Sequence, residues 1–423
     1  MTRLRITIML GLLALADPCA AQQPLTLAEA QAEARAHAPE AAELDALVRG
    51  AEVFAAQAGR RFRQNPEVSG NYFNGAILGL DETSWSVGAT LPVDISGSWK
   101  PRAASANADV RRTRFQRDDR LRALDEHVAV AVADVALRQR LVARSQRIVN
   151  LQTIAAGAAH RQLNVGQGTQ LDADSADLDL ASTQVALEQA RGQLAAARAQ
   201  LARLLGRSVS TGLVVADPPE ALASVQRPDF DALVDRDPRV QAARAEVDAA
   251  TFERETFERL VTPTPTLGLN AGYNRRDIPA GSFTGSPFAG ALMANWPDHD
   301  LVFTVSVPIP LFDRQQEPRA LATARLLTAD AKLRTARATV RSELESAWDA
   351  LDAAERAAQA VASTPALIDR DADFVEQAVR AGAFDAVTRT QTLRRLAETG
   401  RVVDTTIRDY RAARAAWVRR SLR

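Results

Sequence analysis

The stretch Leu301-Val302-Phe303-Thr304-Val305-Ser306-Val307-Pro308-Ile309 places a large apolar side chain at every second position. A period of two puts these side chains on one face of a β-strand, with Thr304 and Ser306 on the other. Residues 67–74, 84–93 and 266–273 alternate in the same way. The four segments predict two β-hairpins, at about 66–93 and about 265–309. Their apolar face carries Trp85, Val87, Leu91, Leu267, Leu269, Tyr273, Phe303, Val305 and Val307.

This alternation has two interpretations. The half-buried sheet of a soluble domain would show it, and so would the strands of an outer-membrane barrel, which are about ten residues long and apolar on the outside. Two hairpins supply only four strands, too few to close a barrel, so the second interpretation requires several subunits to pool their strands. The long connection between about 277 and 298 contains Gly281, Gly285, Pro287 and Gly290, which suits an extracellular loop.

The chain also repeats itself once around these hairpins. Four pairs of residues match in two consistent registers, and any one of them alone would be a weak signal. The 17-residue change of register (216 − 199) falls inside the second hairpin. The pairs at an offset of 199 are Pro39–Pro238 and Pro66–Pro265 (238 − 39 and 265 − 66), and those at an offset of 216 are Pro92–Pro308 and Gly166–Gly382 (308 − 92 and 382 − 166).

The repeat divides the chain into four predicted segments. These are a signal peptide at 1–21, a first structural repeat at 22–205, a linker with several Gly and Pro residues at 206–227, and a second repeat at 228–423. Each repeat is expected to contain two shorter helices, a hairpin, a very long helical stretch, a glycine-containing turn and another long helix. The expected helices of the first repeat are 26–37, 39–63, 101–165 and 169–205, and the second repeat opens with 228–236 and 238–261.

Apolar residues recur every seven positions along the long helices. A sustained seven-residue stripe predicts a seam buried against other helices, as in a coiled coil. A filamentous coiled coil would show the same stripes, but the hairpins argue against it. The stripes consist of Leu121, Val128, Val135, Val142 and Val149; Leu180, Leu187, Leu194 and Leu201; Leu326, Leu333 and Val340; and Leu396, Val403, Tyr410 and Trp417.

The first residues carry the features of an export signal. Arg3 and Arg5 precede a short apolar stretch, and small residues follow before Gln22. Cys19 leaves open a lipoprotein signal, although Asp17-Pro18 disfavours it. Lys and Arg total 52, as do Asp and Glu, so the charge balance gives no case for nucleic-acid binding.

No catalytic or metal-binding motif accompanies this architecture. The four histidines, His37, His127, His160 and His299, are not spaced as metal ligands, and Asp298-His299-Asp300 is best explained as a solvated triplet. The sequence contains no phosphate-binding glycine loop and no nucleophile elbow. We therefore expect neither an enzyme nor a cofactor.

These features together resemble the TolC family of outer-membrane factors. The resemblance rests on Leu25-Thr26-Leu27-Ala28-Glu29-Ala30 and on Val165-Gly166-Gln167-Gly168-Thr169-Gln170-Leu171-Asp172. The string from Val305 to Arg314 is similar to the cobalt–zinc–cadmium resistance branch of that family. The resemblance implies a mainly α fold with a membrane β-barrel part: a homotrimer whose twelve strands form a barrel and whose helices form a periplasmic tunnel.

The resemblance also implies two kinds of site. The helical turns, Gly166, Gln167, Gly168 and Thr169 in one repeat and Gly382, Ala383 and Phe384 in the other, would dock a periplasmic adaptor (membrane fusion protein). The family often narrows its mouth with aspartates after the second turn, where this chain has Thr388 and Gln391. Asp172 and Asp174 offer a substitute aperture in the first repeat, although acids there also stabilise a helix N-terminus.

The function implied is that of a passive conduit in the outer membrane. It would complete a tripartite assembly with the adaptor and an inner-membrane RND pump, exporting divalent heavy-metal ions. One alternative keeps the channel but carries drugs, organic solutes or a secreted protein. Another is a periplasmic helical scaffold without a pore.

Overall fold

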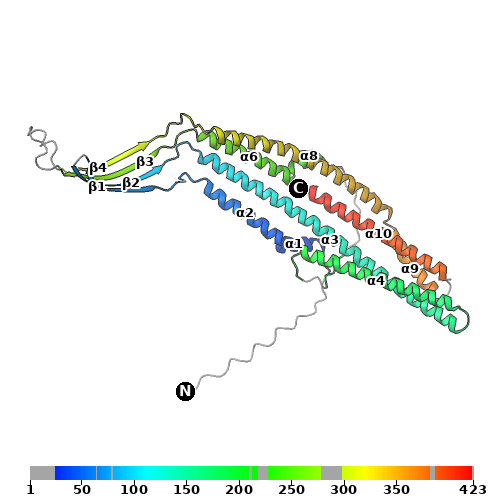
Figure 1. Cartoon of the computed structure of the whole chain (residues 1–423). Coiled ribbons are helices and arrows are strands. Elements are labelled where there is room, and N and C mark those ends of the chain that lie inside the picture. Colours follow the sequence, from blue (N-terminus) through cyan, green and yellow to red (C-terminus); the bar gives the residue numbers. More distant parts are fainter. Residues whose placement is uncertain are drawn as a thin grey trace, which may run out of the picture. The chain divides into compact units, whose positions relative to one another are not determined.

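The computed structural model describes residues 24–62, 64–77, 80–208, 212–217, 227–277, 298–381 and 386–421. The predicted signal peptide at 1–21, Cys19 and the expected extracellular loop after residue 277 lie outside these ranges. Figure 1 labels the helices and strands along the chain, and the same labels are used below.

The elements follow one another in the same order twice. The start of β1 and the start of β3 are separated by 199 residues (266 − 67), and α4 and α10 begin 216 residues apart (386 − 170), so both predicted offsets recur. The twofold repeat is thereby confirmed. The first copy contains α1 (Leu27–His37), α2 (Pro39–Ala58), β1 (Glu67–Ile77), β2 (Leu80–Pro92), α3 (Trp99–Asn164) and α4 (Gln170–Leu204). The second contains α5 (Phe230–Arg236), α6 (Pro238–Arg259), β3 (Thr266–Asp277), β4 (Asp298–Ser306), α8 (Gln316–Ala360), α9 (Thr364–Arg380) and α10 (Ala386–Ser421).

Two expectations about the second copy are wrong. The very long helix is continuous only in the first copy, where α3 has 66 residues, while its counterpart divides into α8 and α9. Pro365 causes the division, because proline has no N–H for the carbonyl four residues earlier and its ring clashes with it. Strand β4 ends at Ser306 and not at Ile309, since Pro308 cannot donate to a strand ladder.

The chain forms two compact units, each assembled from segments of both copies. Unit one comprises the described residues of 1–46, 117–238 and 338–423, and unit two those of 47–116 and 239–337. Among the described helices, none is long and apolar enough to cross a membrane.

Unit two contains a four-stranded antiparallel sheet in the order β1-β2-β3-β4 (Figure 1). The β2–β3 pairing joins the two copies, with Trp85 opposite Tyr273 and Leu91 opposite Leu267. A hydrogen-bonded turn links β2 to α3. In this turn the Asp94 carboxylate accepts hydrogen bonds from the Ser96 backbone N–H at 2.9 Å and from the Ser98 hydroxyl at 2.8 Å.

Unit one has its core between α1, α3 and α4. Val128, Val135 and Leu201 are each fully buried there. Segment 212–217, predicted as part of a linker, contributes buried Leu213 and Val215 to the same core. All sixteen stripe positions predicted along the long helices are buried or half-buried, which confirms that these stripes form the buried seams.

Candidate functional site

The first helical turn ends α3 and begins α4 with a closed set of hydrogen bonds. Gly166 takes a φ of 72°, a left-handed conformation that glycine adopts without strain. The Thr169 backbone N–H and hydroxyl donate to the Asp172 carboxylate at 3.1 and 2.7 Å, and the Asp172 N–H donates back to the hydroxyl at 3.2 Å. The turn is therefore rigidly built from the residues predicted to dock an adaptor.

The capping geometry determines what Asp172 does in this chain. Hydrogen bonds from the Thr169 hydroxyl and backbone N–H hold the pKa of the Asp172 carboxyl below its usual value. Asp174 accepts a hydrogen bond from the Gln170 amide at 2.7 Å. Both acids thus have local structural partners, as expected for acids that stabilise a helix N-terminus. Their proposed part in an aperture stays a prediction.

The second turn is described only in part. Gly382, Ala383 and Phe384 lie outside the described residues, whereas Thr388 and Gln391 are exposed on α10. The nearby Thr390 hydroxyl donates to the Asp179 carboxylate at 2.8 Å, which joins α10 to α4. Sequence patterns did not single out this contact, because its partners are 211 residues apart.

The sheet of unit two presents two chemically different faces. Directly opposed residues share a face, so the pairings place the predicted apolar residues of β2, β3 and β4 together. Most of these side chains are exposed, with Phe303 at 67% and Leu269 at 52%. Val307 is also exposed, but it lies beyond the end of β4. Trp85, Tyr273 and His299 form one cross-strand row, with ring centroids 6.4 and 5.2 Å apart.

The opposite face is mainly polar and carries several glycines, with Phe73 and Val302 as its exposed large apolar residues. A Cβ built on Gly272 would lie 2.2 Å from a carboxylate oxygen of Asp300, and one built on Gly88 would lie 2.6 Å from the amide oxygen of Asn270. These glycines therefore leave space in which the longer polar side chains of the neighbouring strand lie flat on the sheet.

Unit one contains a charge network that the sequence did not predict. Arg144 on α3 donates to Asp404 on α10 at 2.5 Å, and Arg140 lies 3.8 Å from the same carboxylate. Arg140 and Arg411 also pair with Asp217, Arg411 at 2.8 Å. Burial raises the pKa of the Asp404 carboxyl, and this effect exceeds the opposing effect of Arg144. The network ties α3, α10 and segment 212–217 together.

The described part of the chain holds no group of three or more His, Cys, Asp or Glu side chains that could bind a metal ion. His160 instead pairs with Asp177 at 3.0 Å, and His299 stacks on Tyr273.

Solved channel structures share this fold. A membrane protein from Pseudomonas aeruginosa superposes with a TM-score of 0.73 over 93% of both chains at 18% identity. CusC, for which folding and transmembrane channel formation have been described, superposes with a TM-score of 0.68 over 93% of this chain and 91% of its own at 16% identity. The fold is thus the TolC-like one of outer-membrane channels.

The sequence assigns the family more narrowly. Residues 55–207 and 231–417 match the outer membrane efflux protein family, and the chain belongs to it. The outer membrane efflux protein BepC of Brucella suis biovar 1 (strain 1330) is 24% identical over 295 residues, which cover 68% of this chain and 62% of BepC. Membership places the protein in the cell outer membrane, extending into the periplasm, in a family of channels and not of enzymes. The cobalt–zinc–cadmium branch indicated by Val305 to Arg314 is not distinguished by these relatives.

Proposed function

We propose that the protein is the outer-membrane subunit of a tripartite efflux system, acting as a passive homotrimeric conduit for divalent heavy-metal ions. The adaptor and the inner-membrane RND pump supply recognition and energy, so this chain needs only a water-filled lumen. The domain boundaries at 22–205, 206–227 and 228–423, and the signal peptide at 1–21, belong to the same proposal.

The two-faced sheet carries the proposal. Its apolar face is exposed in the single chain, Gly88 and Gly272 on its mainly polar face make room for Asn270 and Asp300, and its edge strands β1 and β4 pair on one side only among the described residues. Three copies would pair edge to edge, giving twelve strands with apolar groups toward lipid and polar groups toward the lumen. The exposed large side chains would otherwise lie in water.

The assembly is tested by the state of the protein in the cell. We expect a trimer in the outer-membrane fraction that resists SDS at room temperature and dissociates on heating. Single-channel recordings in planar bilayers should then give discrete openings. Recovery as a soluble periplasmic monomer without conductance would favour the helical scaffold instead.

The identity of the cargo is tested by the sensitivity of a deletion strain to metals and drugs. The heavy-metal assignment rests on the similarity of Val305 to Arg314 to the metal-resistance branch, and a wide channel selects its cargo weakly. A deletion strain should become sensitive to cobalt, zinc and cadmium salts and regain resistance when the gene is returned. Sensitivity to organic drugs without any change toward these metals, or loss of a secreted protein, would move the cargo to the alternative class.

The periplasmic sites are tested separately. We place adaptor docking at Gly166–Thr169 and at the turn after α9, and a candidate aperture at Asp172, Asp174, Thr388 and Gln391. Asp174→Ala removes a carboxylate without breaking the cap, while Asp172→Ala removes both carboxylate and cap. If neither variant changes conductance or block by divalent cations, these acids do not form the aperture.

A further inference from the structure

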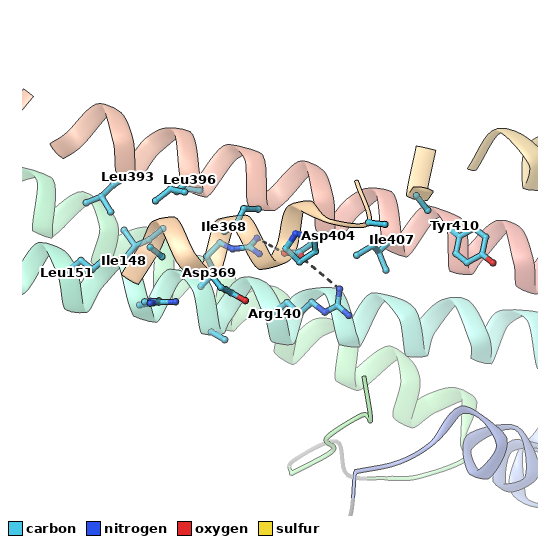
Figure 2. Close-up of a pocket in the computed structure, with 18 residues that line it drawn as sticks. Arg140, Ile148, Leu151, Ile368, Asp369, Leu393, Leu396, Asp404, Ile407 and Tyr410 are labelled. Carbon is cyan, nitrogen blue, oxygen red and sulfur yellow. Dashed lines mark hydrogen bonds and ion pairs between the residues drawn. The ribbon is translucent and has the colours of Figure 1, made fainter. Parts of the chain in front are cut away.

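A cavity lies in unit one where α3, the end of α8, α9 and α10 meet (Figure 2). Its volume is about 630 Å³, within the range of sites that bind small organic molecules. None of the residues predicted as sites from the sequence lines it, and neither the proposed adaptor docking nor the proposed aperture uses it.

The cavity exists because the long helix of the second copy is broken where that of the first copy, α3, is continuous. Pro365, which lines it, ends the path of α8, and the chain turns through 361–363 before α9 begins. At the matching position of the first copy, 145–147, α3 runs on without a break. Small side chains leave the space open, namely Ala143, Ala358, Ala362, Ala372 and Ala397.

The lining is divided into an apolar part and a charged part. Figure 2 shows Leu393, Leu396, Ile148 and Leu151 gathered at one end, with Asp369, Asp404 and Arg140 beside them nearer the middle. A purely polar ligand would leave the aliphatic end unfilled, and a purely apolar one would leave the Asp369 carboxylate without a partner. The shape therefore favours an amphipathic occupant.

The ion pairs of the lining indicate whether that occupant carries a positive or a negative charge. Arg144 pairs with Asp404, Arg140 with Asp217 and Asp404, and Arg147 with Asp373 and Glu376. Each arginine of the lining thus already has a carboxylate partner. Asp369 lines the cavity, is exposed, and forms no hydrogen bond or ion pair with any described residue. Among the described charged groups of the lining, Asp369 is consequently the one without an ion-pair partner.

We propose that this cavity binds an organic cation with an apolar body. Its positive group lies against Asp369, and its hydrocarbon part fills the end formed by Ile148, Leu151, Leu393 and Leu396. The proposal concerns a site in the helical wall and does not depend on which cargo passes through the channel.

Binding of rhodamine 6G, a fluorescent organic cation with an apolar ring system, tests the site. The assembled protein is placed in lipid nanodiscs, and fluorescence anisotropy is followed against empty nanodiscs. We expect saturable binding that weakens about two- to fivefold in Asp369→Asn, since one ion pair with an exposed carboxylate is lost. Asp371→Asn, on an exposed part of the same helix outside the lining, should bind like the unaltered protein.

A second pair of variants tests the cavity itself. Ala397→Leu fills the space and should abolish saturable binding, whereas Ala366→Leu adds the same atoms at an exposed position of α9 outside the lining. Circular dichroism tests whether both variants are folded. If Ala397→Leu does not fold, the comparison of Asp369→Asn with Asp371→Asn still tests the proposal. The proposal is overturned if rhodamine 6G does not saturate, if Asp369→Asn and Asp371→Asn bind alike, or if the anion 8-anilinonaphthalene-1-sulfonate binds in its place.

Discussion

Gly400→Ala and Gly192→Ala, two substitutions within helices, should change the free energy of unfolding in opposite directions. Gly400 on α10 lies beneath the Arg144 guanidinium, and a Cβ there would be 2.4 Å from its Cζ and Nη1 atoms. Gly192 on α4 has no atom within 4 Å of the same built Cβ. Only the first substitution therefore displaces a neighbour.

Two opposing contributions decide whether each substitution stabilises or destabilises the protein. Alanine stabilises a helix interior by about 1 kcal/mol relative to glycine, which is the whole effect expected for Gly192→Ala. In Gly400→Ala the methyl group pushes Arg144 away from Asp404, whose side chain is only 4% exposed. Loss of a hydrogen bond to a charged group costs about 1.5–3 kcal/mol, so Gly400→Ala should be destabilising by about 1 kcal/mol net.

Thermal unfolding followed by circular dichroism measures the difference. A chain of 423 residues has an unfolding entropy of about 0.9 kcal/mol/K at roughly 2.1 cal/mol/K per residue. The two variants should therefore differ in Tm by about 2 °C at one scan rate, with Gly192→Ala higher.

A third measurement isolates the cause. In an Arg144→Ala background the obstructing side chain is absent, so Gly400→Ala should become stabilising, like Gly192→Ala. The explanation fails if Gly400→Ala raises the Tm of the otherwise unaltered protein, or lowers it equally in both backgrounds.

Three further changes have definite expected outcomes. Leu201→Ala, at a fully buried position, should cost about 2–5 kcal/mol in unfolding experiments, and Leu178→Ala, 72% exposed, less than about 0.5 kcal/mol. Burial raises the pKa of the Asp217 carboxyl, but hydrogen bonds from Arg140 and Arg411 outweigh it and hold that pKa below its usual value. Its contribution to stability is therefore present above about pH 4 and lost as pH falls further, so Asp217→Asn should show a smaller loss of Tm in acid. Gly272→Ala should lift the Asp300 carboxylate off the sheet and raise cation over anion permeability, measured as a reversal potential in a KCl gradient; an unchanged potential would count against the proposed lumen.

The sequence predicted those elements whose signal is local and periodic. The long helix expected at 101–165 runs from 99 to 164, and the stripe residues Val135 and Leu201 are fully buried. Both follow from a repeating pattern that many residues reinforce. The alternation predicts a strand that reaches Ile309, but β4 ends at Ser306 because Pro308 lacks the N–H that a strand ladder requires.

Interactions that depend on the tertiary fold carry no such signal. Arg144 and Asp404 are 260 residues apart, and no pattern in either helix marks them as partners. The break at 361–363 did have a local cause in Pro365, but the match to the first repeat predicted a continuous long helix. The cavity, which depends on this break, could not be predicted without it.

The way each compact unit is assembled from both repeats affects how the protein can be made. Unit one combines segments before residue 47 with segments after residue 337, and the two segments of unit two are separated by more than a hundred residues. Neither unit can therefore be completed before the second repeat has been synthesised, although the core between α1, α3 and α4 uses residues of the first repeat and segment 212–217. The strands of unit two thus have to wait for partners from the other repeat, and during that interval their apolar side chains are open to non-native association.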